Sequence, residues 1–289
     1  MIKKATKISN GVKNILNTIG NTPLIKIGKI CAKLETVNPS GSIKDRMVKY
    51  LVEKAEEEGK LEPGYTIIEA TSGNTGISFA MISAVKGYNF IAVMPENIGR
   101  EKRKLMKLFG AKFILTPENH GLAEAIEKTR ELAKKYKKVW LPRQFENPDN
   151  VRAHQRGLGQ EILREMEKID VFVAGIGTGG TLMGVAKALR NKFPRVKIFG
   201  VEAAESLHQI EGISDGIVPK ILDFSLIDGM IKIKSEDAIK MAKKLAKKQG
   251  LLVGISSGAN VLAAQKLSKR YKKVVTVLPD RAERYLELW

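Results

Sequence analysis

Cysteine is almost absent from this sequence of 289 residues, which has a single cysteine, Cys31, and only three histidines. One thiol excludes an internal disulfide and a cysteine-based metal cage, and so few soft ligands argue against a structural zinc site. We therefore predict no metal centre. Between Ile30 and Ala32, Cys31 is predicted to be a small buried residue of a strand.

Long apolar runs are also missing. No hydrophobic stretch approaches the length of a membrane span, and residues 1–14 contain neither an apolar block nor a cleavage site. From these absences we expect a soluble, cytoplasmic protein that does not enter a membrane.

Acidic residues are few relative to basic ones: 31 Asp and Glu stand against 50 Lys and Arg, a formal charge of +19. A surplus of this size is found in proteins that bind nucleic acid or anionic substrates. Here the lysines form short clusters inside amphipathic helical patterns, as at 134–136, 243–248 and 269–273. Aromatic residues make up only 6%. This distribution favours a solvated surface, and we expect no nucleic-acid partner.

Strand-like and helix-like patterns alternate along the chain. The helical patterns include 43–55 and 121–136, where apolar residues recur on one face. Apolar, β-rich runs predict strands at 66–69, 90–94, 113–116, 171–174, 197–201 and 274–278. The alternation predicts an α/β fold with largely parallel sheets, and a polar stretch at 144–148 indicates a change of domain.

Ligands of open α/β sheets bind where a strand ends and a loop leads into a helix. One such junction is the segment 71–76, which follows the strand 66–69 and precedes an apolar helical pattern. It carries four polar side chains, Thr71, Ser72, Asn74 and Thr75, which is more than the capping of a helix requires. The segment therefore predicts an anion site suited to a carboxylate.

A second junction, 175–181, follows the strand 171–174. Gly175, Gly177 and Gly180 fit the dinucleotide pattern G-x-G-x-x-G, and Glu202 lies about twenty residues further on, as that pattern requires. This segment alone favours a nicotinamide or flavin cofactor. Its end, 179–181, also fits a compact cup for a monophosphate.

A third junction contains Ser42 and Lys44. Ser42 is a good N-cap residue and places Lys44 in the first helical turn, where the helix dipole disfavours a cation. A buried lysine there would be a neutral, nucleophilic amine. The alternative is a surface lysine that pairs with Asp45 or Glu35. A fourth Gly/Ser turn, 254–259, is a weak signal alone.

In chain order, these four segments resemble the β-family, or fold type II, of pyridoxal-phosphate enzymes. The resemblance is closest to cysteine synthase (O-acetylserine sulfhydrylase) and its cystathionine β-synthase relatives. It favours pyridoxal 5′-phosphate over a dinucleotide. Further matching stretches are 19–24, 93–96, 144–148, 250–253 and 283–286.

The resemblance implies a tryptophan synthase β-like fold with two domains, whose mostly parallel twisted sheets are flanked by helices. It places a large cofactor-binding domain at 1–36 and 147–289 and a small mobile domain at 37–146. It also implies a homodimer.

The resemblance further implies roles for individual residues. Lys44 would bind the cofactor covalently and later move the substrate α-proton. Asn74 would contact the 3′-oxygen of the cofactor, and Ser256 its pyridine nitrogen. The phosphate cup would be Gly177, Thr178, Gly179, Gly180 and Thr181. The substrate α-carboxylate would be held by Thr71, Ser72, Thr75 and Gln144.

The implied reaction is a β-replacement that forms L-cysteine from sulfide and an activated serine, either O-acetylserine or O-phosphoserine. Alternatives are condensation of serine with homocysteine, as in cystathionine β-synthase, and more remotely a nicotinamide-dependent oxidoreductase. If the donor is O-phosphoserine, Arg156 and Arg281 are the candidate phosphate contacts.

The chain departs from the family pattern at the rim of the expected pocket. The segment 202–209 passes almost directly into 210–216, residues 157–160 replace the usual Thr-Thr-Gly-Pro, and 280–283 replace Asp-Ser-Gly-Glu. These changes leave the leaving group of the donor open. They also argue against docking of serine acetyltransferase, which in the family inserts its tail into this site.

Overall fold

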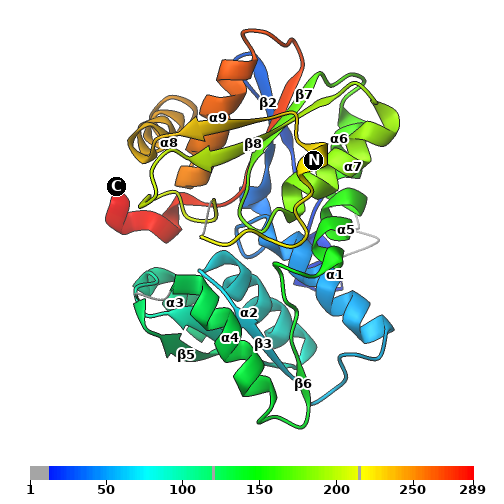
Figure 1. Cartoon of the computed structure of the whole chain (residues 1–289), viewed down its shortest axis with the longest axis vertical. Coiled ribbons are helices and arrows are strands. Elements are labelled where there is room, and N and C mark those ends of the chain that lie inside the picture. Colours follow the sequence, from blue (N-terminus) through cyan, green and yellow to red (C-terminus); the bar gives the residue numbers. More distant parts are fainter. Residues whose placement is uncertain (1–12, 119–120, 214–215) are drawn as a thin grey trace, which may run out of the picture.

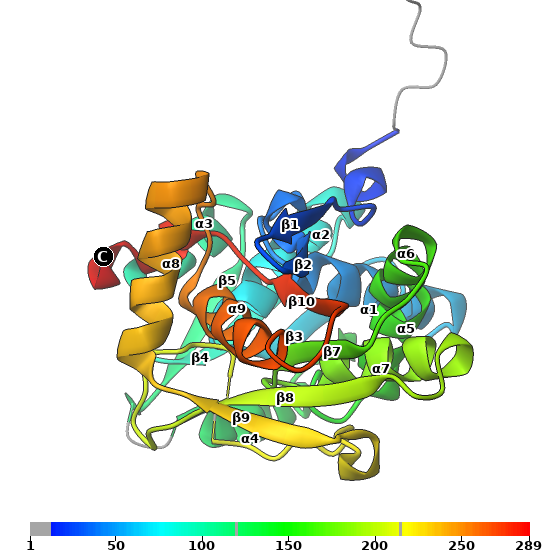
Figure 2. The same ribbon diagram turned by 90° about the horizontal axis from the view of Figure 1, so that it is seen from above.

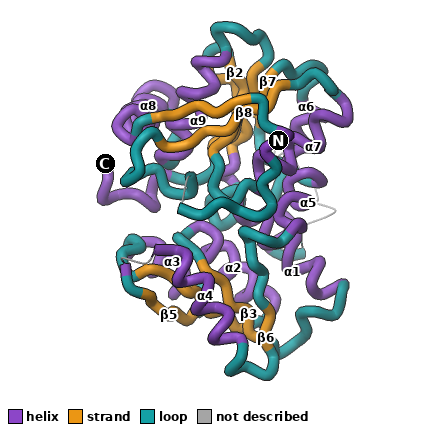
Figure 3. The backbone as a smooth tube through the Cα atoms, in the orientation of Figure 1, coloured by secondary structure: helices purple, strands orange, loops and turns teal. Residues whose placement is uncertain are grey.

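The structure, a computed structural model, describes residues 13–118, 121–213 and 216–289. Two α/β units lie one above the other, each built around its own sheet (Figure 1). Helices lie on both sides of the strands in each unit (Figure 3). The predicted fold class is therefore confirmed. Within the described residues, no helix combines the length and apolar character needed to cross a membrane.

The larger sheet has six strands, in the order β1-β2-β10-β7-β8-β9. Its strands are parallel except for β1, which pairs antiparallel with β2 at one edge. Their bounds are β1 (Leu24–Ile27), β2 (Ile30–Leu34), β7 (Val171–Gly175), β8 (Lys197–Ala203), β9 (Gly229–Ile233) and β10 (Val274–Leu278).

Helices cover both faces of this sheet (Figure 2). Val171 and Val173 of β7 pack into the core beneath α8 (Ser235–Gln249) and α9 (Ile255–Leu267). Phe172 and Ala174, which alternate with them, pack into the core on the other face, beneath α5 (Pro148–Arg156), α6 (Leu158–Glu165) and α7 (Gly180–Lys192). Burial on both faces explains why the central strands are continuous apolar runs.

The smaller sheet has four parallel strands, in the order β5-β4-β3-β6. One of its faces is covered by α1, α2 and α3, and the other by α4. The strands are β3 (Thr66–Ala70), β4 (Asn89–Pro95), β5 (Lys112–Thr116) and β6 (Val139–Trp140). The helices are α1 (Lys44–Glu57), α2 (Asn74–Lys86), α3 (Arg100–Leu108) and α4 (Gly121–Ala133). The boundaries 37 and 146, and the mobility of the smaller unit, stay predictions.

The six strands predicted from apolar runs correspond to β3, β4, β5, β7, β8 and β10. The runs did not reveal β1 and β9, because these edge strands expose part of their side chains, nor β6, which has only two residues. Cys31 lies in β2, as predicted, but it is only half-buried. The prediction of a buried cysteine was wrong because Cys31 lines a surface hollow between the β1–β2 turn and residues 268–273.

A buried network of charged side chains joins the two units. Arg46 of α1 donates to Glu35 from Nε and to Glu161 of α6 from Nη1, both at 2.6 Å. Lys33 of β2 pairs with the other carboxylate oxygen of Glu161 at 2.9 Å. Burial alone would raise the pKa of Glu161, but the hydrogen bonds and charge of Arg46, the Lys33 ammonium and the Asn21 amide together lower it to about 2. The network therefore depends on an ionised Glu161.

We predict that Glu161→Gln destabilises the protein by ~3–5 kcal/mol at neutral pH, because it leaves buried cations without a full countercharge. The native pKa of Glu161 is below its ordinary value of 4.5. The stabilisation by Glu161 is therefore complete above the ordinary value and is lost as the pH falls towards about 2. Denaturant unfolding at a series of pH values should show the difference between the two proteins shrinking below about pH 4.5.

The matched control is Glu131→Gln, which removes a carboxylate from an exposed pair with Lys128. Its effect should stay within about 1 kcal/mol at every pH. A Glu161→Gln deficit that does not change with pH would contradict the role given to this carboxylate.

Candidate active site

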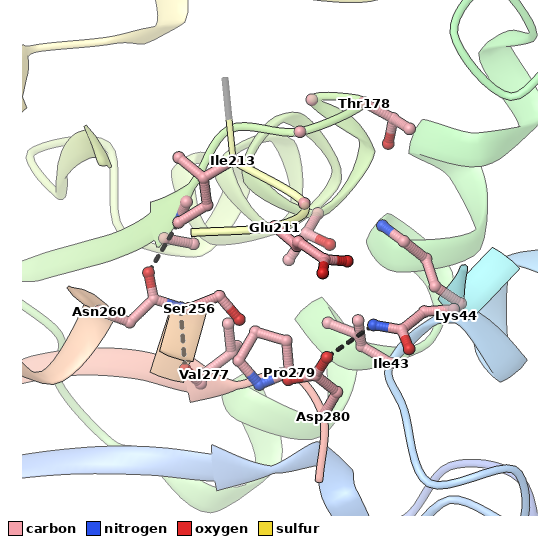
Figure 4. A pocket seen from close by; sticks show the side chains of 17 residues that line it. Ile43, Lys44, Thr178, Glu211, Ile213, Ser256, Asn260, Val277, Pro279 and Asp280 are labelled. Carbon is pink, nitrogen blue, oxygen red and sulfur yellow. Dashed lines mark hydrogen bonds between the residues drawn. The ribbon is translucent and has the colours of Figure 1, made fainter. Parts of the chain in front are cut away.

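Two adjoining cavities lie between the two units, at the carboxyl ends of β7 and β10 and the starts of α1, α2 and α9. Figure 4 shows the first of them. The first cavity contains the glycine-rich segment that follows β7, and the second contains the polar segment that follows β3. Six residues line both: Lys44, Asn74, Gly177, Thr178, Glu211 and Gly212. The four segments predicted from sequence therefore meet at one place.

The first cavity is walled by Gly177, Thr178, Gly179 and Thr181. Gly179 adopts a left-handed conformation with φ of 82° just before α7 begins. A Cβ atom at Gly177 would overlap the carbonyl oxygen of Gly212, so only glycine fits at position 177. Gly180 opens α7 behind the wall, where a Cβ would overlap Asn150. Backbone amides at a helix start and neutral hydroxyls suit a phosphate monoester.

The first cavity is also lined by Asn74 and Ser256, the first residue of α2 and the second of α9. The Asn74 amide donates to Asp280 Oδ2 at 2.6 Å, and the Tyr285 hydroxyl donates to the same oxygen. Asn74 Oδ1 is buried and has no hydrogen-bond partner among the described residues. Since buried polar atoms are rarely left unpaired, this orphaned atom indicates a ligand site.

The second cavity contains Ser72, Thr75 and Gln144. The Thr75 hydroxyl donates to Gln144 Oε1 at 2.7 Å, and Gln144 Nε2 donates to the carbonyl oxygen of Ala70 at 2.8 Å. Thr71 does not line this cavity: its hydroxyl oxygen accepts from the amides of Gly73 and Gly76, each at 3.0 Å. Thr71 therefore stabilises the conformation of the loop 71–76 through these two hydrogen bonds.

Lys44 stands at the junction of the two cavities and is half-buried. It is the first residue of α1, and its backbone amide donates to the Ser42 hydroxyl at 3.3 Å. The acids considered as surface partners of Lys44 are engaged elsewhere. Asp45 is buried and accepts from Ser78 and from the Ser40 amide, and Glu35 pairs with Arg46. The Lys44 amine points into the pocket (Figure 4).

Glu69, a residue that the sequence did not indicate, holds Gln144 in place. Its carboxylate accepts from the backbone amides of Arg143 at 2.8 Å and Gln144 at 3.2 Å. Burial raises the pKa of Glu69 to about 8, although the two amides and the Arg143 charge act in the opposite direction. Glu69, a residue of β3, therefore holds the backbone of Gln144 and so positions its side chain.

His154 lies beneath the glycine-rich wall, with Nε2 3.4 Å from the Thr181 hydroxyl. Burial, and then the charges of Lys44 and Arg46, hold the pKa of His154 well below its usual value. A neutral imidazole at this position supports Thr181 without adding charge to the cavity.

Several residues singled out from sequence lie outside the cavities. Neither Arg156 nor Arg281 lines them, and Arg281 Nε donates to the carbonyl oxygen of Thr36 at 2.7 Å. Glu202 pairs with Lys232 at 3.8 Å across β8 and β9. Glu202, the acidic residue of the dinucleotide pattern, thus lies outside the pocket.

Sequence reasoning assigned no role to four ionisable residues that line the cavities, although it placed 210–216 and 280–283 at the rim of the pocket: Lys102, Glu211, Asp280 and Tyr285. Asp280 had a usable signal, because it follows β10 at the same sheet edge as the other site segments. Lys102 had none, since only the fold brings α3 close to the loop after β8.

Comparison with known proteins places this site in a family. The profile of pyridoxal-phosphate dependent enzymes matches residues 15–280. The chain belongs to this family. It is 46% identical over 290 residues to cysteine synthase B of Campylobacter jejuni, covering 95% of this chain and 97% of that one. It is 42% identical over 297 residues to a cysteine synthase of Staphylococcus aureus, covering 95% and 96%.

Among solved structures, the O-acetylserine dependent cystathionine β-synthase from Helicobacter pylori is similar to this chain, with a TM-score of 0.93 and 39% identity. The match covers 97% of this chain and 99% of that one. The chain is thus a pyridoxal-phosphate-dependent enzyme of the cysteine synthase family, as predicted. This family assignment overturns the nicotinamide alternative.

The donor set of the cavities fits pyridoxal phosphate. The glycine wall offers amides and hydroxyls for a phosphate, and Lys44 offers an amine for the aldehyde. The orphaned oxygen of Asn74 indicates that a polar ligand binds beside it. Within the described part of the chain, no three His, Cys, Asp or Glu side chains gather as metal ligands would.

We predict that Gly177→Ala weakens binding of pyridoxal phosphate by at least about tenfold, or ~1.4 kcal/mol, because the added methyl group displaces Gly212. Titration of the apoprotein, followed by the absorbance of the bound cofactor, measures this loss. Gly99→Ala is the control, since its Cβ meets nothing closer than Glu101 at 3.5 Å. Equal affinities of the two variants would show that the wall does not depend on Gly177.

Proposed function

We propose that this enzyme forms L-cysteine by β-replacement, from an activated serine and sulfide. The position of Lys44 carries the proposal. Its amine lies where the glycine-walled cavity meets the cavity of Ser72, Thr75 and Gln144, so one side chain reaches both a phosphate-anchored cofactor and a bound amino acid.

In this proposal, Gly177 to Thr181 hold the phosphate of the cofactor, Asn74 its 3′-oxygen and Ser256 its pyridine nitrogen. Ser72, Thr75 and Gln144 hold the α-carboxylate of the substrate, and Thr71 keeps their loop in shape. The start of α2 adds the positive end of a helix dipole to the carboxylate site.

Bound pyridoxal phosphate supplies an electron sink for the pair of electrons left at the substrate α-carbon. Lys44 Nζ takes the α-proton, and it is close enough to the second cavity to do so because α1 begins at this residue. The carboxylate loop fixes the amino acid while the bond from Cβ to the leaving group breaks. Sulfide then adds at Cβ, and Lys44 Nζ returns the proton to the α-carbon.

Ser256 favours this β-chemistry over transamination or racemisation. A hydroxyl group does not keep a pyridine nitrogen protonated as a carboxylate does, so a carbanion at the α-carbon is less stabilised and loses its β-substituent promptly. The carboxylate of Asp280 also lines the cavity, but one of its oxygens is engaged by Asn74 and Tyr285. It therefore orients Asn74.

Homocysteine is the alternative acceptor, and the likeness to the Helicobacter pylori enzyme favours testing it. Both cavities are small and closely walled by Glu211, Gly212 and Thr178, which suits sulfide better than a longer thiol. We also infer a homodimer in which residues 37–146 close over the substrate, and no docking of serine acetyltransferase.

We predict that Lys44→Ala abolishes the visible absorbance of covalently bound cofactor and lowers turnover on the order of a thousandfold, since both the linkage and the proton acceptor are lost. Borohydride reduction of the unmodified protein, followed by peptide mass spectrometry, should place the cofactor on Lys44. Lys54→Ala, on the exposed side of the same helix, should leave absorbance and turnover unchanged. A reduced cofactor found on another lysine would refute this assignment.

For the acceptor, we predict that sulfide is used at least about tenfold more efficiently than homocysteine with O-acetylserine as donor, because the cavity admits small nucleophiles best. Product analysis by mass spectrometry distinguishes L-cysteine from cystathionine. Faster formation of cystathionine would replace the proposed activity with the alternative one.

A further inference from the structure

The second cavity has a charged wall next to the carboxylate loop, formed by Lys102, Glu211 and Tyr285. Lys102 packs against Gly73 of that loop, where an added Cβ atom would overlap its side chain. Because the cavity is small, an amino acid held by the carboxylate loop, with its α-carbon beside Lys44, brings its β-substituent close to this wall.

An ion pair between Lys102 and Glu211 spans this wall. Lys102 belongs to α3 of the smaller unit and is almost fully buried, with 1% of its surface exposed. Its ammonium also lies 4.8 Å from the centre of the Tyr285 ring. The Glu211 side chain comes from the loop after β8 of the larger unit and is 38% exposed. In Figure 4 its carboxylate faces the same central space as the Lys44 amine.

These contacts decide which charge the wall presents to a substrate. The positive charge of Lys102 is already balanced by Glu211 and the face of Tyr285, whereas Glu211 keeps part of its carboxylate towards the cavity. Among the described residues that line this cavity, the only other cation is Lys44, and there is no arginine. Arg156 and Arg281 lie outside it.

We propose that Glu211 is a specificity-determining residue, which admits a serine carrying a neutral β-substituent, such as an acetyl ester, and rejects one carrying a phosphoryl group. A phosphorylated serine brings a charge of about −1.5 to −2 at neutral pH. Placing that charge beside the Glu211 carboxylate is unfavourable, because like charges repel strongly where little water screens them. The inference rests on the proposed β-replacement and names its donor class.

The test compares O-acetylserine with O-phosphoserine on the holoenzyme, by stopped-flow absorbance of the bound cofactor. We expect the unmodified enzyme to favour O-acetylserine in kcat/KM by at least about tenfold. Glu211→Gln keeps the shape of the side chain and removes its charge, so it should raise the relative efficiency with O-phosphoserine by about tenfold. Lys102→Gln leaves the charge of the Glu211 carboxylate unbalanced. It should lower the relative efficiency with O-phosphoserine below that of the unmodified enzyme.

Glu167→Gln is the matched control. It removes one negative charge from an exposed residue that precedes β7, at the opposite end of the larger sheet, and should leave the donor ratio unchanged. We expect the efficiency with O-phosphoserine relative to O-acetylserine to rise in Glu211→Gln and to fall in Lys102→Gln. If the ion pair only stabilised the structure, its loss in either variant would impair both donors alike and leave this ratio unchanged.

Three outcomes would overturn the inference: equal or better use of O-phosphoserine by the unmodified enzyme, an unchanged ratio in Glu211→Gln, or a change of the same sign in both variants. These are distinct from failure of the proposed function. If neither donor alters the cofactor spectrum of the unmodified enzyme, the β-replacement itself is refuted, and the donor class with it.

Discussion

The site depends on where the first residue of α1 is held. Residues before Lys44 are bound to the segment that follows β10: the Ile43 amide donates to the carbonyl oxygen of Pro279 at 2.8 Å, and Ser42 forms a β-bridge with Asp280. Two residues after Lys44, the Arg46 guanidinium is buried between carboxylates of the larger unit. The lysine is thus fixed on both sides by the larger unit, although its helix packs into the core of the smaller one. This placement lets one amine serve two cavities.

The parallel sheets explain why the other groups converge on that amine. In a parallel sheet, the ends of all strands meet at one edge, and each following helix points its positive end back at that edge. Asn74, the Gly177–Thr181 segment and Ser256 occupy such helix starts. The binding groups are mostly neutral amides and hydroxyls, so much of the positive electrostatic potential at a bound anion comes from the N-termini of the helices. Glycine is required where Gly177 faces Gly212, because a side chain there would occupy the space between the two loops.

Sequence reasoning succeeded where the signal was local. Strands buried on both faces show as apolar runs, and the residues that would bind the cofactor lie in short segments after β3 and β7, where hydroxyls and glycines cluster. It failed where the structure depends on pairs distant in the chain. Asn74 and Asp280 are joined across 206 positions, and Lys102 and Glu211 across 109. No pattern in the sequence around these residues predicts which distant residue each one contacts. Cys31 shows the same limit, since its half-burial results from a hollow made by a distant turn.

The strong positive charge of the chain does not determine what the site accepts. Screening in salt confines the influence of exposed charges to about 8–10 Å, and most of the described lysines lie at the surface, as they do along α8. At the cavities the ionisable groups are balanced instead, with Lys44 and Lys102 against Glu211 and Asp280. Because Lys102 and Glu211 come from different units, the wall that faces the β-substituent exists only when the units are together. The proposed selection by charge therefore depends on the contact between the two units.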